Sequence, residues 1–208
     1  VLALGCAVIV APMVLGQVEA LPEGSRFYFV TEPVAGLAIG AIVRLLVLAL
    51  QTAGVIAAQS TSLSQVFGGA GADPAPAIGH MLLVGGLALA VMSGLHVKLA
   101  ELLILSYEIL PVGQMPSAEL MSSWGLAHVA RAFSLAFSLA GPFVVAALIY
   151  NVALGVINRA MPQLMVAFVG APAITFGGLV LLLLTAPIIL SIWSETLSSL
   201  LAAPFGEP

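Results

Sequence analysis

Long apolar segments alternate with short polar ones along the chain, and this pattern predicts helices apolar enough to enter a bilayer. About five apolar segments can be drawn, at 1–15, 33–58, 78–110, 132–151 and 164–193. The first is at the low end of the length that spans a bilayer, which is roughly 17–25 residues for a helix. We therefore predict an all-α fold: a polytopic membrane protein built of helical hairpins with kinked or broken helices.

Polar residues at helical spacing modify the second and third segments. Arg44 and Gln51 are seven residues apart and so share a face, which either packs against a neighbour or lines a water-filled path; the spacing favours packing. Residues 78–110 would form a helix of about 50 Å, too long for a hydrocarbon core near 30 Å. The second half of this segment is amphipathic and should lie against protein or water, with charges on one face at Lys98, Glu101 and Glu108.

Several shorter features punctuate the rest of the chain. Gly141-Pro142 predicts a kink, Gly177-Gly178 permits close helix contact, and the polar tail 195–208 is expected to fray. Residues 117–131 are mildly amphipathic. Three of their side chains suit a membrane interface, namely Trp124, His128 and Arg131.

The longest stretch rich in small and polar residues is 59–77. A loop of about 19 residues between two apolar segments is longer than usual, and such loops are either functional or mobile. The residues alone leave both interpretations open. A regular helix is excluded from the second half by Gly68, Gly69, Gly71, Pro74 and Pro76.

A polar break inside 147–170 is the least expected feature of so apolar a chain. It is formed by Asn151, Asn158, Arg159, Pro162 and Gln163. An arginine at the centre of a lipid-facing helix costs roughly 2.5–3.5 kcal/mol, and a proline removes a backbone donor. The break is therefore predicted to face protein or water rather than lipid.

Composition supports a membrane or assembly protein. Only 7% of the residues are charged, 62% are hydrophobic, and the mean hydropathy is +1.21. Soluble domains have about 25% charged residues, so this chain has too little polar surface to cover a globule in water. The net charge of −4 argues against a nucleic-acid partner. The single Cys6 excludes a disulfide framework.

The motifs of membrane enzymes are missing from the sequence. No HExxH pair is present among His80, His96 and His128, and Asp73 is the only aspartate, so neither a zinc nor an aspartyl protease is indicated. We expect no enzyme activity, no cofactor and no metal. A secondary transporter would place polar residues at broken helices, but the chain is short and shows no duplicated halves.

The break motif resembles the signature of FliR, the export-gate subunit of the flagellar type III secretion apparatus. The run NVALGVINRAMPQL, from Asn151 to Leu164, is similar to the family's Asn, Leu-Gly and Arg-x-x-Pro-Gln-Leu. The family continues with a polar residue where this chain has Met165, so that polar contact is not carried over. Further matches are Gln51-Thr-Ala-Gly54, Asp73-Pro74, His96, the run from Ser106 to Gly113, Pro142 and Gly170-Ala-Pro172.

The resemblance covers nearly the whole chain and implies one FliR-like export-gate domain over 1–208, with the family's N-terminal hydrophobic hairpin arm missing. It implies a non-enzymatic subunit of a hetero-oligomeric flagellar type III protein export gate, forming the substrate-conducting pore with FliP-like and FliQ-like partners. A FlhB-like subunit and unfolded flagellar export substrates are further implied partners. The implied location is the flagellar basal body in the bacterial inner membrane. The alternatives are an injectisome (virulence) counterpart and a small secondary transporter or channel.

The resemblance also implies roles for two sets of residues. A plug that closes the idle pore would comprise Gln65, Phe67, Gly68, Gly69, Gly71, Asp73 and Pro74. Assembly and the helix break would depend on Asn151, Gly155, Arg159, Pro162 and Gln163. Arg159 is expected to pair with an acidic group or with helix C-terminal carbonyls. Pro162 would set the bend, while Asn151 and Gln163 would satisfy the backbone groups it frees.

Overall fold

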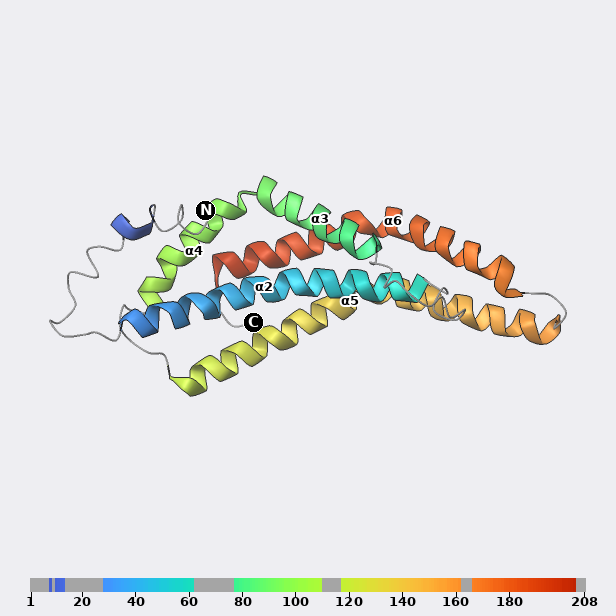
Figure 1. Ribbon diagram of the computed structural model, residues 1–208, viewed down its shortest axis with the longest axis horizontal. Helices are drawn as coiled ribbons and strands as arrows, with labels where there is room; N and C mark the ends of the chain where they lie inside the picture. The colour runs from blue at the N-terminus through green and yellow to red at the C-terminus, as the bar shows by residue number, and fades with distance from the viewer. Residues whose placement is uncertain are drawn as a thin grey trace. The chain divides into compact units, whose positions relative to one another are not determined.

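The computed structural model describes residues 8, 10–13, 28–61, 77–109, 117–161 and 166–204. The all-α prediction is confirmed, since no strand occurs within these residues. The long helices are α2 (Tyr28–Thr61), α3 (Ala77–Met92), α4 (Leu95–Ile109), α5 (Ala118–Ala160) and α6 (Val166–Ala202), as Figure 1 shows. Most of the first apolar segment and the whole predicted plug lie outside the described residues.

The helices pack through narrow stripes of buried side chains. On α2, burial recurs every three or four residues, which is the period of one helix face. Most of the remaining residues of α2 are half-buried or exposed, and both Arg44 and Gln51 are exposed. The spacing of these two residues favoured packing against a neighbour. Within the described part of this chain, neither residue is buried against another helix. The buried stripe consists of Ile39, Ile42, Leu46, Ala49, Leu50, Ala53 and Ala57.

The chain divides into two compact units. The first comprises Val1–Leu46, Leu89–Arg131 and Glu195–Pro208, and the second comprises Val47–Ala88 and Ala132–Ser194. Helices α2, α3, α5 and α6 each contribute residues to both units. The largest fully buried side chains of the second unit are Leu50, Phe143 and Trp193.

A bend of 70° separates α3 from α4. The break falls at Ser93 and Gly94, and Gly94 has a φ of +78°, a conformation that suits glycine because it has no Cβ. The Gly94 carbonyl then accepts bonds from the amides of Val97 and Lys98, which starts the next helix. The prediction that 78–110 is too long for one straight span is confirmed, and the residue that ends the first helix is this glycine.

Two expectations about α5 and α6 are wrong. Residues 117–131 and 132–151 are not separate segments, because α5 runs for 43 residues through Gly141-Pro142 without interruption. The polar tail does not fray from residue 195, because α6 continues to Ala202. Three leucines bury this last part of the helix, and they are Leu197, Leu200 and Leu201.

Within the described residues, three helices are long and apolar enough to cross a membrane, or four if the bent α3–α4 pair counts as one span. The three are Val30–Thr61, Met121–Ala160 and Pro172–Ala202, with 32, 40 and 31 residues. At 1.5 Å per residue they measure about 48, 60 and 46 Å. Each is therefore much longer than a hydrocarbon core of about 30 Å.

Candidate functional site: the α5–α6 hairpin

The described part of the predicted assembly motif occupies the last turns of α5. Asn151, Gly155 and Arg159 are four residues apart, so they form one row along a single helix face. All three are exposed, and the side chains of Asn151 and Arg159 make no hydrogen bond or ion pair with another described residue. Pro162 and Gln163 lie outside the described residues, so the roles assigned to them stay predictions.

The opposite face of α5 packs on α6 and holds the hairpin together. The Tyr150 hydroxyl donates a hydrogen bond of 2.5 Å to the backbone carbonyl of Gly170. A Cβ atom added at Gly170 would lie 2.8 Å from that hydroxyl and 3.3 Å from Leu154 Cδ1. Because Tyr150 and Leu154 are four residues apart, they act together as one inward row that leaves no space for a side chain at position 170.

The end of α2 closes against the same hairpin. Gly178 of α6 faces Thr61, and an added Cβ there would lie 2.6 Å from Thr61 Cγ2. Gly177, by contrast, has nothing within 4 Å of its added Cβ. Of the two glycines, Gly178 makes the expected close helix contact and Gly177 does not. The Thr61 hydroxyl bonds the Ala57 carbonyl at 3.1 Å, which satisfies its polar group inside the contact.

An apolar groove of about 250 Å³ lies beside this contact. Thr61 and Tyr150 supply its polar atoms, and most of its other lining residues are small or aliphatic. A groove of this kind can receive an apolar helix or an acyl chain but offers no grouped acids, bases or nucleophiles for catalysis. The remaining lining residues are Ala146, Ala147, Ala173, Ile174, Gly177, Gly178, Val180, Leu181 and Leu184.

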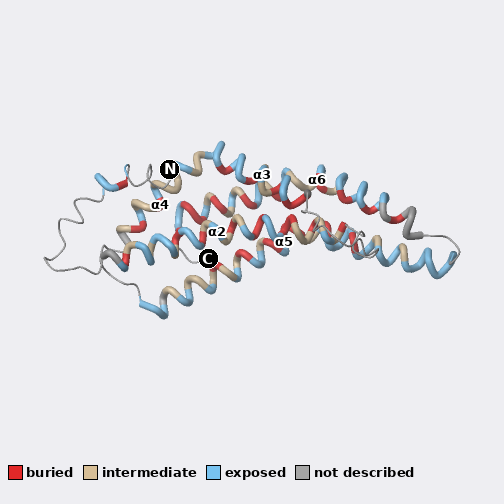
Figure 2. Tube along the Cα trace, in the orientation of Figure 1, coloured by how far each residue is buried: buried red, intermediate tan, exposed pale blue. Residues whose placement is uncertain are grey.

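The outer surface of the hairpin is apolar and exposed. Figure 2 shows this exposure along the last turns of α5. On α5 the exposed side chains include Phe133, Phe137, Val144, Val145, Leu148, Ile149, Val152, Val156 and Ile157. On α6 they include Phe176, Leu179, Leu183, Leu184 and Ile188. So much exposed apolar surface indicates a face covered by lipid or by other proteins.

Arg159 lies among these exposed apolar side chains and is the basic residue of the last turn of α5. Its position near the helix C-terminus lets the guanidinium interact favourably with the carbonyl end of the helix dipole. It remains exposed, and within the described residues no carboxylate pairs with it. The expected acidic partner therefore does not come from the described part of this chain.

A second polar cluster, which the sequence suggested only as an interface, lies in the first unit. The Trp124 indole Nε1 donates to the Pro204 carbonyl at 3.0 Å, and its ring stands edge-on to His128 with centroids 5.1 Å apart. His128 is buried, not at a surface. Because Pro204 is 80 residues away in sequence, no local pattern predicts this contact.

Metal binding finds no support in the described part of the chain, where no group of three His, Cys, Asp or Glu residues comes together. His96, one of the positions that match the family, is exposed on α4.

Comparison with known proteins agrees with the motif. The family described as "Bacterial export proteins, family 1" matches residues 1–200. The flagellar biosynthetic protein FliR of Caulobacter vibrioides is 32% identical over 204 residues, covering 96% of this chain and 81% of the relative. FliR of Aquifex aeolicus is 34% identical over 167 residues, covering 78% of this chain and 63% of the relative. The exposed apolar helices, the Asn-Gly-Arg row and these similarities lead to one conclusion: the chain belongs to the FliR family of bacterial export proteins and is a membrane-embedded component of the flagellar export apparatus.

Proposed function

We propose that the chain is a non-enzymatic subunit that helps to form the substrate-conducting pore of the flagellar export gate. FliP-like and FliQ-like subunits would surround it, a FlhB-like subunit would adjoin it, and unfolded flagellar proteins would pass through the assembled pore. The assembly would lie in the bacterial inner membrane at the flagellar basal body, with residues 1–208 acting as one export-gate domain. The observation that carries this proposal is the length of the exposed apolar surface on α5.

Helix length distinguishes burial in lipid from burial in protein. Exposed apolar side chains run along α5 from Leu126 to Ile157, which is about 46 Å of helix. A membrane helix tilted by about 40°, the upper end of the usual range, has about 39 Å of its length inside a core of about 30 Å. Lipid tails alone therefore leave part of this apolar surface in water, and packing by neighbouring subunits would cover it.

The row formed by Asn151, Gly155 and Arg159 supports the same interpretation. An exposed arginine amid apolar side chains is costly against lipid but stabilising against a carboxylate of another subunit. Gly155 between the two polar residues would let the partner's backbone approach closely. We place a subunit interface on this row.

The plug assignment is the second part of the proposal. Gln65, Phe67, Gly68, Gly69, Gly71, Asp73 and Pro74 would close the idle pore, with Phe67 as the apolar contact and the glycines permitting movement. Deleting residues 68–71 should raise ion leak through the closed gate in membrane vesicles. Replacing them with an equally long Gly-Ser segment controls for loop length, and an unchanged conductance after the deletion would count against the plug.

Co-purification tests the proposal as a whole. The chain is expressed with an affinity tag, alone and together with the FliP-like and FliQ-like proteins of the same organism. We expect a monodisperse complex only when the partners are present, because the exposed face of α5 needs a protein cover. A chain that is stable and monodisperse by itself and captures neither partner would favour a small transporter instead.

A further inference from the structure

The second half of α2 has an exposed face that is polar, although the helix is apolar enough to cross a membrane. From position 43 to the end of the helix, five residues are exposed. One of them is Leu48, and the other four are polar. We call these four residues the polar strip, and they are Arg44, Gln51, Thr52 and Gln59.

Exposed residues on comparable stretches of the long helices are of the opposite kind. On α6, eleven residues from Pro172 to Ile188 are exposed, and Thr175 is the one polar side chain among them. In the first half of α2, the exposed positions from Val30 to Ala41 carry no polar side chain. Lipid or an apolar protein surface can cover those stretches, whereas the polar strip requires different surroundings.

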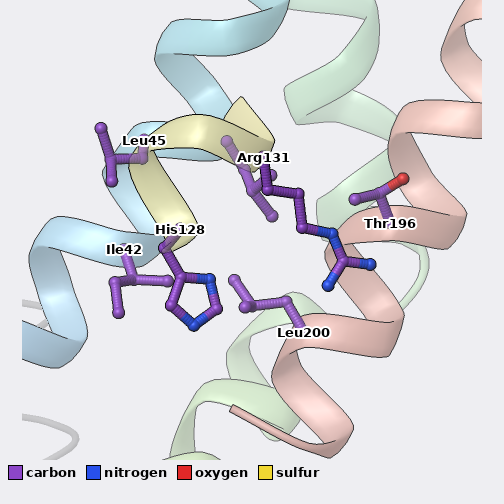
Figure 3. Close-up of a pocket in the computed structure, with 7 residues that line it drawn as sticks. Ile42, Leu45, His128, Arg131, Thr196 and Leu200 are labelled. Carbon is purple, nitrogen blue, oxygen red and sulfur yellow. The ribbon is translucent and has the colours of Figure 1, made fainter. Parts of the chain in front are cut away.

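Helix geometry places the polar strip on one face. At 3.6 residues per turn the four side chains fall within an arc of about 100°, and positions 44 to 59 extend over about 22 Å of helix. The opposite side of α2 is covered by the chain's own helices. There, Ile42 lies beside a small cavity together with His128 of α5 and Leu200 of α6 (Figure 3). The polar strip therefore lies on the side of α2 that is turned away from these contacts.

Lipid is a poor cover for the polar strip. Arg44 lies near the middle of the 32-residue span Val30–Thr61, where a bilayer would be driest. Ionisable side chains inside membrane spans almost always face protein or a water-filled cavity, and they commonly mark the path of a transported molecule. The choice is therefore between another subunit and water.

The distribution of small residues favours water over a closely packed subunit. Helices in membranes approach each other through small residues. In this half of α2 the small residues lie on the buried side, where Gly54 meets the backbone of Gly79 on α3. The exposed side carries the long side chains of arginine and glutamine, which hold a partner backbone at a distance. The row on α5 differs, because Gly155 lies between its two polar residues.

We propose that the polar strip lines the aqueous lumen of the export pore, an inference that rests on the proposed function. In the sequence, the strip ends two residues before the end of α2 at Thr61, and the proposed plug follows. Water and a passing unfolded polypeptide meet amide, hydroxyl and guanidinium groups along this face. Such groups exchange hydrogen bonds with a moving chain and offer few apolar contacts that would retain it, as conduction requires.

Cysteine labelling in the intact assembly tests the proposal. In a Cys6→Ser background, single cysteines replace Gln51, Gln59 and, as an apolar control, Leu183, which is 75% exposed on α6. Open membrane fragments from cells that express the chain with its native partners are treated with a charged, membrane-impermeant maleimide. Thiols react as thiolates, and apolar surroundings raise the thiol pKa, so we expect both strip positions to react about tenfold or more faster than the control.

A stalled substrate distinguishes the lumen from an outer surface. An export substrate fused to a stably folded domain occupies the pore, and we expect it to slow the labelling of Gln51→Cys towards the control rate. Unchanged labelling in its presence would overturn the assignment to the lumen. Equal rates at all three positions, or strip rates that fall to the control value whenever the partners are co-expressed, would show that lipid or a subunit covers the strip and would also overturn it.

Co-purification of the partners from the same membranes reports on the proposed function separately. Slow labelling of the strip in a complex that co-purifies normally would refute the lumen assignment alone. Loss of co-purification in the Cys6→Ser parent would refute the proposed function, and the lumen assignment with it.

Discussion

The two halves of α5 use polar residues in opposite ways. In the first half, Trp124 turns inward and its indole donates to the carbonyl of Pro204, with the buried His128 edge-on to its ring. In the second half, Asn151 and Arg159 turn outward and find no partner within the described residues. Since both halves belong to one apolar helix, the difference separates polar groups that complete the chain's own fold from polar groups that stay exposed, and we propose that the exposed ones meet other subunits.

The same contrast appears in the apolar residues. The inner faces are closed by short-range contacts such as Tyr150 with Gly170 and Thr61 with Gly178. The outer faces of α5 and α6 carry long rows of exposed aliphatic and aromatic side chains. Substitutions at inner positions should therefore change stability, whereas substitutions in the outer polar row should change assembly.

The largest effect is expected at Arg159. Arg159→Ala should abolish incorporation into the gate, because the partner's acidic group would be left without its counter-charge in an interface. Co-purification with the FliP-like and FliQ-like subunits, together with swimming motility, measures the loss. Arg44→Ala is the matched control for incorporation, since Arg44 is also exposed on an apolar helix but lies outside the motif. Normal incorporation of Arg159→Ala would refute its assembly role.

The neighbouring glycines of α6 test the inner packing. Gly178→Ala should destabilise the chain by about 1–3 kcal/mol, because the new Cβ overlaps Thr61. Gly177→Ala is the control and should be neutral or stabilising by up to about 1 kcal/mol, because alanine favours a helix and position 177 is open. Thermal melting of the two variants in detergent gives the comparison. Equal stabilities would mean that α2 and α6 are not in close contact at this point.

A smaller effect is expected at the inward polar cluster of α5. Trp124→Phe keeps an aromatic ring beside His128 but removes the bond to Pro204, so we expect a loss of about 0.5–1.5 kcal/mol. Co-purification of partners should remain normal, in contrast to Arg159→Ala. Loss of assembly at wild-type stability would show that this half of α5 also serves an interface.

The smallest effect is expected at the hairpin bond. Tyr150→Phe removes only the hydroxyl that bonds Gly170, and because Tyr150 is half-buried the loss should lie near about 0.5 kcal/mol. Tyr150→Ala should cost several times more, since Leu154 would lose its neighbour on the inner row. If the two variants melted at the same temperature, the ring would contribute nothing to the hairpin.

Sequence reasoning succeeded where the signal was local. Apolar period and composition predicted an all-α membrane fold, and the Asn-Gly-Arg run identified the family. The length of 78–110 indicated that one straight span would not fit a hydrocarbon core, although the break at Gly94 was not predicted, because a glycine in an apolar run has many possible uses. These inferences needed no knowledge of which helices meet.

The failures concern contacts between distant residues. The tail after Glu195 contains two serines and looked frayed, yet its leucines fall on one helix face and are buried. His128 looked like an interface residue because its neighbours are amphipathic, and its burial among residues of α2 and α6 depends on contacts that are distant in sequence. Tertiary contacts of this kind override local polarity, and a single sequence does not reveal them.

Photo-crosslinking from the outer face of α5 tests the central claim most directly. A photoreactive residue is placed at Val156, which is 64% exposed beside the polar row, in the full chain expressed in cells with its native partners. We predict efficient crosslinks to other subunits of the export gate. Adducts to lipid alone, with a functional gate and no protein crosslink at this position, would contradict the account.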